Sequence, residues 1–320
     1  MILNSMNKIS VIILTRNRVK ALKNISLRSL TKQTYRKFEV IVWDASDDDL
    51  SQKVVMGFKG KSQSINIKYF KAPRKGIASQ RNDAVKTALG EIVFFIDNDS
   101  EVSPEGIDSV LKEFDDSQVF GVGLSLKSMG VNNDSEKYSL LRKIYCNIFK
   151  LYNRYASFRK IYPSGWNGMN SFFDHPGEAQ WLSGCSMAYR KEVFNRFNFE
   201  ERLEKFGGYA IGEDVQFSSK LFMNGMKMII AENGHIIHHR VADGRLDDKS
   251  MVAARIYNHF VMWKTVTFKH SKISILNFTW SLIGEIIYQF SMSLFSKNTE
   301  IIKGIKMGLK AILNSPNNKV

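Results

Sequence analysis

The sequence predicts an α/β fold in which a mostly parallel central sheet is flanked by helices. Short β-branched and aromatic runs, typical of buried strands, alternate with helical stretches along the first 100 residues. These runs lack alternating polar residues, and uninterrupted apolar strands indicate a sheet that is covered on both faces. The chain has 320 residues, which is enough for one large domain with an appendage or for two domains.

The first part of the chain should contain four strands and two helices. Strands are expected at residues 8–14, 38–43, 65–70 and 92–96, and helices at residues 18–33 and 75–89. Gly90 directly follows the second helix, at the position where a glycine commonly ends a helix. This alternation predicts a nucleotide-fold half-barrel or a doubly wound sheet, and in such sheets ligands bind at the carboxyl ends of the strands.

The middle of the chain is less regular. Strands are expected at residues 119–126, 180–189, 226–230 and 235–237. Helices are expected at Ser103–Phe114, with Pro104 in the first turn, and from Lys191 onward. Residues 138–160 should form a basic amphipathic helix or a loop insert. We assign residues 1–250 to one domain, with residues 1–100 and 101–250 as its two halves.

Residues 251–320 have a different character and should form a separate helical region. They carry nine Lys or Arg residues against two acids, Glu285 and Glu300. Residues 275–295 are about as long as a membrane span, but Glu285 and several polar residues lower their hydrophobicity. A helix that lies in the membrane interface or packs on the core is therefore favoured over a true span. Residues 300–313 should form a basic amphipathic helix.

The composition limits the classes of partner. The net charge is +15 and the pI is about 9.6, which favours partners that carry phosphate: nucleic acid, anionic lipid or a nucleotide substrate. The basic stretches coincide with amphipathic segments, which favours an anionic membrane surface over nucleic acid. Cys146 and Cys185 predict neither a disulfide nor a zinc site, as in a reducing cytosol. The N-terminal apolar run is too short for an export signal, so we expect a cytoplasmic location.

The strongest local pattern is an apolar strand that ends in two carboxylates, Asp97 and Asp99. Side chains two residues apart on an extended chain lie on one face, so both carboxylates should point into one site. Two like charges buried together need a counter-cation, and a hard divalent ion with oxygen ligands suits them. The alternative is a solvated turn in which Asp99 caps the next helix.

Other charged residues fall at the ends of predicted strands. Asp44 ends the second strand and could accept hydrogen bonds from a nucleobase or a ribose, or could belong to an acidic turn. Arg16 closes the first strand in the same layer. Arg81 could bind a diphosphate, although a single arginine is more often a surface residue.

Two acids and a group of histidines occur later in the chain. Glu213 and Asp214 open a helix, where they either cap its N-terminus or provide a general base for an acceptor hydroxyl. His235, His238 and His239 follow a short strand and could supply a metal ligand, although a lone histidine is more often structural.

In this order, the motifs resemble those of family 2 glycosyltransferases, which have the GT-A fold. The similarity covers roughly residues 8–240. The corresponding segments are the Thr-x-Asn turn at residues 15–17, an Asp-Asp-Gly-Ser motif reduced to one acid at 43–46, Gln-Arg-Asn at 80–82 where the family has Ala-Arg-Asn, the DXD motif at 97–99, the acceptor-side strand at 181–190, the ED motif at 213–214, and a later histidine at 238.

The resemblance implies a Rossmann-like, nucleotide-binding GT-A domain with a nucleotide-sugar half (1–100) and an acceptor half (101–250). It implies an inverting, single-displacement transfer from a UDP-, GDP- or dTDP-sugar, with Mg²⁺ or Mn²⁺ as cofactor. Asp214 would be the catalytic base. The nucleotide-sugar residues would be Thr15, Arg16, Asp44, Arg81, Asp97 and Asp99, the metal ligands Asp97, Asp99 and His238, and the acceptor residues Trp181, Gly184 and Glu213.

The chain also departs from the family pattern. Trp43 replaces an acid, Ala45 replaces a glycine and Ser100 replaces a frequent third acid, so the nucleoside stays open. The choice of His238 over His239 as the metal ligand is open as well.

The basic tail resembles that of family members that act on lipid-linked glycans. It implies surface-polysaccharide synthesis, such as that of O-antigen or capsule, at the cytoplasmic face of a bacterial inner membrane, by a peripheral or monotopic enzyme. Two alternatives remain: a catalytically inactive GT-A assembly subunit, against which the intact acids argue, and a basic nucleic-acid-binding protein, which needs aromatic and basic residues on one face.

Overall fold

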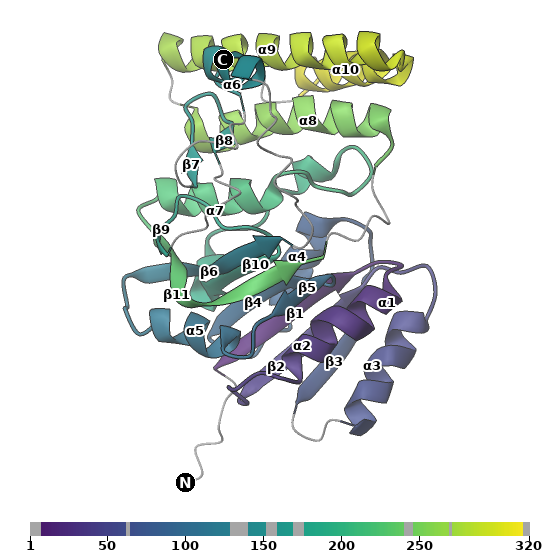
Figure 1. The fold of residues 1–320 in the computed structure, drawn as a ribbon, viewed down its shortest axis with the longest axis vertical. Helices are drawn as coiled ribbons and strands as arrows, with labels where there is room; N and C mark the ends of the chain where they lie inside the picture. Colours follow the sequence, from purple (N-terminus) through teal and green to yellow (C-terminus); the bar gives the residue numbers. More distant parts are fainter. Residues whose placement is uncertain are drawn as a thin grey trace.

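The protein consists of a curled, nine-stranded sheet covered by helices, with a layered stack of helices at one end (Figure 1). The computed structural model describes residues 8–61, 65–128, 140–151, 159–168, 176–239, 246–268 and 271–315. In the view of Figure 1, α7, then α8, then α9 and α10 lie in successive layers above the sheet. The predicted α/β class is confirmed.

The N-terminal part of the sheet is parallel, as the sequence predicts. Its strands are β1 (Ile9–Thr15), β2 (Phe38–Asp44), β3 (Asn66–Lys71) and β4 (Ile92–Asp97), in the spatial order β3-β2-β1-β4. All three pairings are parallel. Every residue of β2 is buried, which explains why this strand is mostly apolar. Their carboxyl ends meet at one edge, where Thr15, Asp44 and Asp97 are the last strand residues.

The connecting helices differ from the prediction in two places. Residues 19–30 form one irregular helix, in which a π-helical turn (Leu22–Leu27) lies between α1 (Val19–Ala21) and α2 (Arg28–Leu30). α3 (Leu50–Lys61) was not predicted, and α4 (Ile77–Val85) is shorter than the helix predicted over 75–89. Gly90 therefore does not end a helix. A Cβ at Gly90 would lie 2.6 Å from the backbone nitrogen of Ser10, so the close approach of β1 requires glycine there.

The second part of the sheet mixes directions. β10 (Ser186–Arg190) runs antiparallel between β4 and β6 (Val119–Ser128), and β11 (Lys227–His238) runs parallel to β6. β5 (Ser100–Val102) and β9 (Gly177–Glu178) pair with β11 in antiparallel fashion. The strands predicted at 226–230 and 235–237 are both parts of β11, separated by an irregular register, and the strand predicted at 180–189 begins only at Ser186.

The helices of the middle region cover this part of the sheet. They are α5 (Gly106–Glu113), α6 (Leu140–Ile148), α7 (Glu213–Met223) and the 3₁₀ helices Lys191–Asn195 and Glu201–Glu204. Pro104 lies before α5 rather than in its first turn. A small ribbon pairs β7 (Lys160–Ile161) with β8 (Asn167–Gly168). Part of the predicted insert at 138–160 lies outside the described residues.

Three helices form the C-terminal end: α8 (Asp248–Met262), which continues as a π-helical turn (Trp263–Thr267), α9 (Lys272–Ser296) and α10 (Thr299–Leu313). Each begins at a polar residue whose side chain accepts a backbone N–H of the first turn, namely Asp247, Ser271 and Asn298. Among the described residues, none of the helices combines the length with the hydropathy that a membrane crossing needs.

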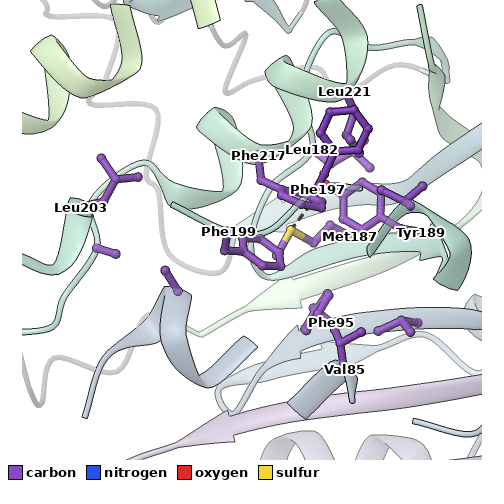
Figure 2. Close-up of a cluster of buried hydrophobic side chains, with 14 of the residues drawn as sticks. Val85, Phe95, Leu182, Met187, Tyr189, Phe197, Phe199, Leu203, Phe217 and Leu221 are labelled. Atoms are coloured by element: carbon purple, nitrogen blue, oxygen red, sulfur yellow. Dashed lines mark hydrogen bonds between the residues drawn. The ribbon is translucent and has the colours of Figure 1, made fainter. Parts of the chain in front are cut away.

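Aromatic side chains fill the space between the sheet and α7 (Figure 2). The rings of Phe199 and Phe217 stack with centroids 4.1 Å apart, and Phe95 of β4 meets Phe199 edge to face at 5.5 Å. Tyr189 of β10 packs against Phe217 at 5.1 Å. This cluster holds α7 over β4 and β10, and so fixes the N-terminus of α7 relative to the carboxyl end of β4.

Candidate active site

Asp97, Asp99 and His238 come together where β4 and β11 end. β5 pairs with β11 so that Ser100 lies opposite His238, and this pairing brings the end of β11 to the turn that carries Asp99. His238 Nε2 lies 3.2 Å from Asp99 Oδ1 and 3.7 Å from Asp97 Oδ2. The three residues predicted as metal ligands therefore form one cluster, which we call the Asp97–Asp99–His238 cluster.

The chemistry of this cluster fits a divalent cation. One donor atom of each residue lies within 4.8 Å of the others. Loss of hydration, followed by the negative charges of Asp99 and Asp214, raises the pKa of Asp97, against the opposing influence of His238 and Arg81. A cation relieves such crowding of carboxylates, and two carboxylates with one imidazole suit Mn²⁺ or Mg²⁺.

The structure separates neighbouring histidines and arginines near the cluster. His239 turns to Glu101, whose Oε2 lies 3.1 Å from His239 Nε2, so His238 is the histidine beside the aspartates. Arg18, which the sequence analysis missed, places Nη1 3.6 Å from Asp99 Oδ2. Arg16 is exposed instead, and its charge acts on Asp47. The signal for Arg18 was its place in the turn after β1.

Arg81 lies buried between the two halves of the site. Its Nη1 lies 2.6 Å from Glu213 Oε1, and its Nη2 lies 3.9 Å from Asp97 Oδ1. The guanidinium also rests on the rings of Phe95 and Phe199, at 5.6 Å and 5.3 Å from their centroids. Aromatic faces and a carboxylate together hold the guanidinium in place, so Arg81 is a fixed positive charge beside Asp97.

Glu213 and Asp214 open α7, as the sequence predicts, but their environments differ. Glu213 is buried, and burial raises its pKa to about 8, with Arg81 opposing and Asp214 reinforcing the shift. Asp214 is partly exposed. Its Oδ2 accepts the backbone N–H of Gly184 at 2.7 Å and its Oδ1 accepts that of Val215 at 2.8 Å. Asp214 is therefore the oriented and accessible carboxylate of the pair.

Gly184 sits at the tightest point of this arrangement. A Cβ at position 184 would lie 3.0 Å from Arg81 Nη2 and 3.3 Å from Asp214 Oδ2. Its carbonyl oxygen lies 3.4 Å from Arg81 Nη2. Gly184 thus contacts both charged groups through its backbone, which explains why the residue without a side chain occurs here.

Thr15 and Asp44 are the last residues of β1 and β2, at the carboxyl edge of the sheet. Thr15 Oγ1 accepts the side-chain amide of Asn98 at 3.1 Å, which ties the end of β1 to the turn between Asp97 and Asp99. Asp44 is fully buried: Ser46 N–H donates to its Oδ1 at 2.8 Å, and the Tyr69 hydroxyl donates to its Oδ2 at 2.8 Å. Tyr69 was not predicted as a site residue, because only the parallel register of β2 and β3 brings it to Asp44.

Trp181 packs beside the first turn of α7. Its ring is 3% exposed and packs with Val215, Met262 and Val266. The indole N–H donates to the carbonyl of Gly168 at 3.2 Å. The structure thus places Trp181 as a wall behind α7 rather than as an open surface.

Comparison with known proteins gives the same assignment as the motifs. The family model described as "Glycosyl transferase family 2" matches residues 10–197. Poly(ribitol-phosphate) beta-N-acetylglucosaminyltransferase TarS of Staphylococcus aureus is 31% identical over 142 residues, which are 43% of this chain and 24% of that protein. GalNAc(5)-diNAcBac-PP-undecaprenol beta-1,3-glucosyltransferase of Campylobacter jejuni is 26% identical over 165 residues, 47% of this chain and 52% of that protein. An uncharacterized glycosyltransferase of Rickettsia conorii is 36% identical over 107 residues, 33% of this chain and 17% of that protein. The alignments therefore span less than two thirds of these relatives' lengths.

Solved structures show the same fold. Residues 1–349 of S. aureus TarS in complex with UDP-GlcNAc superpose with a TM-score of 0.60 at 18% identity, covering 95% of this chain and 81% of that one. The mannosyltransferase PcManGT of Pyrobaculum calidifontis, in complex with GDP-Man and Mn²⁺, gives 0.56 at 17% identity, covering 97% and 81%. At such identities the likeness establishes the fold, the GT-A fold that the motifs predict. Because the family model matches more than half of the residues, the chain belongs to glycosyl transferase family 2.

Proposed function

We propose that the protein is an inverting glycosyltransferase that moves a sugar from a nucleotide-sugar donor to a hydroxyl of a glycan acceptor. The proposal rests on one observation: the guanidinium of Arg81 connects the Asp97–Asp99–His238 cluster to Asp214. Arg81 Nη2 lies 3.9 Å from Asp97 and 3.4 Å from the carbonyl of Gly184, whose N–H donates to Asp214. A cation site and an accessible carboxylate therefore border the same positive charge.

Each residue has a role in this reaction. Asp97, Asp99 and His238 would hold Mg²⁺ or Mn²⁺, which when bound neutralises charge on the departing diphosphate. Arg81 adds a second fixed positive charge on that side. Thr15, Arg16 and Asp44 belong to the nucleotide side, at the carboxyl edge of β1 and β2.

Asp214 is the general base of the proposed reaction. It takes the proton of the acceptor hydroxyl while the hydroxyl oxygen attacks the anomeric carbon. The new C–O bond forms on the face opposite the breaking bond to the diphosphate, so the anomeric configuration inverts. Trp181, Gly184 and Glu213 shape the acceptor side: Gly184 orients Asp214, and Glu213 orients Arg81.

The acceptor in this proposal is a lipid-linked glycan of a surface-polysaccharide pathway, such as that of O-antigen or capsule. Support comes from the C. jejuni relative, whose name specifies an undecaprenol-diphosphate-linked acceptor. The basic C-terminal region supports the same idea, because a polyprenyl diphosphate carries both charge and an apolar anchor. The enzyme would then work at the cytoplasmic face of a bacterial inner membrane, as a peripheral or monotopic protein.

Thermal-shift titration tests the proposed donor and metal together. UDP-, GDP- and dTDP-sugars are each added with Mn²⁺, with Mg²⁺ or with EDTA. We expect one nucleoside class to raise the Tm by several degrees at saturating donor, and only when the metal is present. If no nucleotide sugar raises the Tm under any metal condition, the proposed function is wrong.

A further inference from the structure

The long helix α9 has its large apolar residues on the exposed side, which is the reverse of an ordinary surface helix. The side that faces the protein is mostly small and polar, and its buried residues are Ser274, Phe278, Ser281, Gly284, Glu285, Gln289 and Ser293. The opposite side carries large apolar residues that are 42% to 72% exposed, namely Ile273, Leu276, Trp280, Ile283, Ile287, Phe290 and Leu294. A helix that borders water has its apolar residues on the inner face. The outer face of α9 therefore fits an apolar environment.

The exposed residues form one continuous line, which we call the α9 stripe. From Ile273 to Leu294 they recur at alternating intervals of three and four residues, which keeps them on one face of a helix. At 1.5 Å per residue the stripe is about 30 Å long. Ile144 and Ile148 of α6 are also exposed, and Phe149 stacks on Trp280 at 4.9 Å, so α6 widens the apolar surface.

Polar contacts fasten the inner side of α9 to the rest of the protein. Arg255 of α8 forms an ion pair with Glu285, and Gln289 donates to Glu285 Oε1 at 2.8 Å. Burial acts to raise the pKa of Glu285, but Arg255 and Gln289 outweigh it and hold that pKa below its usual value. The Tyr145 hydroxyl donates to the carbonyl of Gly284 at 2.7 Å. The stripe is therefore presented outward by a fixed helix.

The helices α6, α9 and α10 lie together at one end of the molecule (Figure 1) and carry many basic residues. Exposed Lys and Arg residues of α6, α9 and α10, or directly next to them, are Arg142, Lys150, Lys272, Lys297, Lys303, Lys306 and Lys310. Among the described residues of these three helices the acids are Glu285, which is buried, and Glu300, which pairs with Lys303 at 2.5 Å. An apolar line bordered by positive charge matches the interface of an anionic bilayer.

We propose that α9 lies in the plane of an anionic lipid membrane, with the α9 stripe inserted among the acyl chains and the lysines of α10 at the lipid headgroups. A second copy of the chain fits less well, because it would bring the same positive charges to the interface. The inference goes beyond the proposed function by naming the surface that contacts lipid. Its test measures lipid binding rather than transfer, so the two can fail separately.

Vesicle co-sedimentation of the full chain tests the apolar part. The vesicles contain phosphatidylcholine alone or phosphatidylcholine with phosphatidylglycerol. We expect wild type to bind the second kind, and Ile283→Ser/Ile287→Ser to bind it at least about tenfold more weakly. The matched control is Leu50→Ser/Met56→Ser on α3, whose side chains are similarly exposed but lie far from the stripe. It should bind like wild type.

A charge variant and an assembly measurement complete the test. Lys306→Glu/Lys310→Glu should abolish the preference for phosphatidylglycerol, while Lys53→Glu/Lys86→Glu should keep it. Wild type that binds neither kind of vesicle would overturn the proposal. So would a dimer, seen by light scattering, that Ile283→Ser/Ile287→Ser converts to a monomer, because a second copy would then cover the stripe.

Discussion

Asp99 is the most enclosed acid of the Asp97–Asp99–His238 cluster, at 2% exposure. Asp99→Asn keeps the shape but removes one negative charge, so the cluster should no longer hold a divalent ion. We expect Mn²⁺ to stop raising the Tm, and transfer to fall on the order of 10³-fold. The control is Glu101→Gln, which alters the neighbouring pair with His239. A Tm that still rises with Mn²⁺ in Asp99→Asn would remove Asp99 from the metal site.

Asp214 should affect a different step of the same reaction. In Asp214→Asn the amide oxygen can still accept a backbone N–H, but the group no longer takes up a proton. We expect donor affinity to stay within about twofold, while transfer falls by about 10²- to 10⁴-fold. Calorimetry of donor binding and an assay of transfer separate the two effects. Asp108→Asn, in the first turn of α5, is the matched control, and retained transfer in Asp214→Asn would assign the base elsewhere.

At the scale of elements, α8 supports the segment that leads into α7. Asn258, buried in α8, donates to the carbonyls of Leu203 at 3.1 Å and Ile211 at 3.0 Å. Asn258→Ala leaves both carbonyls without this donor, which should cost about 1–3 kcal/mol of unfolding free energy. Because Ile211 lies three residues before Asp214, we also expect transfer to fall more than donor binding.

Chemical denaturation and steady-state kinetics measure these two effects. Asn224→Ala is the control, because Asn224 donates to a carbonyl at the exposed C-terminal end of α7. If Asn258→Ala lowers stability but leaves transfer unchanged, then α8 stabilises the fold without positioning Asp214.

The elements that the sequence predicts correctly are those whose burial follows from the chain alone. β1, β2 and β4 are mostly apolar runs, and nearly all of their residues are buried. α3 was missed because it contains Gly57 and Gly60 and leaves Leu50 and Met56 exposed, so no single apolar face marks it. β11 appeared as two strands because the polar residues around Asn233 interrupt its register. Long-range pairing joins segments that local patterns separate.

The site residues also divide into those that local patterns predict and those that only long-range pairing brings together. Asp97 and Asp99 come together, as the sequence predicts, but a turn at residues 98–99 brings them together rather than the extended strand that the prediction assumed. The choice of His238 over His239 depends on the pairing of β5 with β11, which no local pattern contains. Likewise Arg18 rather than Arg16 approaches Asp99, because the turn after β1 directs the side chains of residues 16 and 18 differently. Residue types predict the chemistry of the site. The pairing of strands and the shape of the turns decide which of two nearby residues lies in it.

At the scale of the whole molecule, one buried histidine should shape stability in acid. His259 stacks on Trp166 at 4.4 Å, and its Nε2 lies 2.7 Å from the carbonyl of Ser164. Burial lowers its pKa to about 4, and Arg255 acts in the same direction, against Ser164 and Glu285. Between pH 6.5 and 4 the unfolded chain binds a proton that the folded chain does not. The free energy of unfolding that depends on neutral His259 is therefore fully present above about pH 6.5 and is lost as the pH falls to about 4.

His259→Gln keeps a donor for Ser164 and removes the titration. We expect wild type to lose on the order of 3 kcal/mol of unfolding free energy relative to the variant between pH 6.5 and 4. Urea denaturation of both proteins across this range measures the difference. Parallel curves would mean that His259 titrates alike in the folded and unfolded chains.

The ion pair between Glu285 and Arg255 has a consequence for substrate choice. It fastens α9 to α8, and Asn258 fastens α8 to the segment before Asp214, so polar contacts between described residues connect the outer helix to the proposed base. On a bilayer, Asp214 would then stand at a constant height above the lipid. A glycan whose terminal hydroxyl is closer to its anchor than that height, or farther from it, would miss the base. The protein would act as a ruler, which accepts a growing chain by its length as well as by the identity of its last sugar.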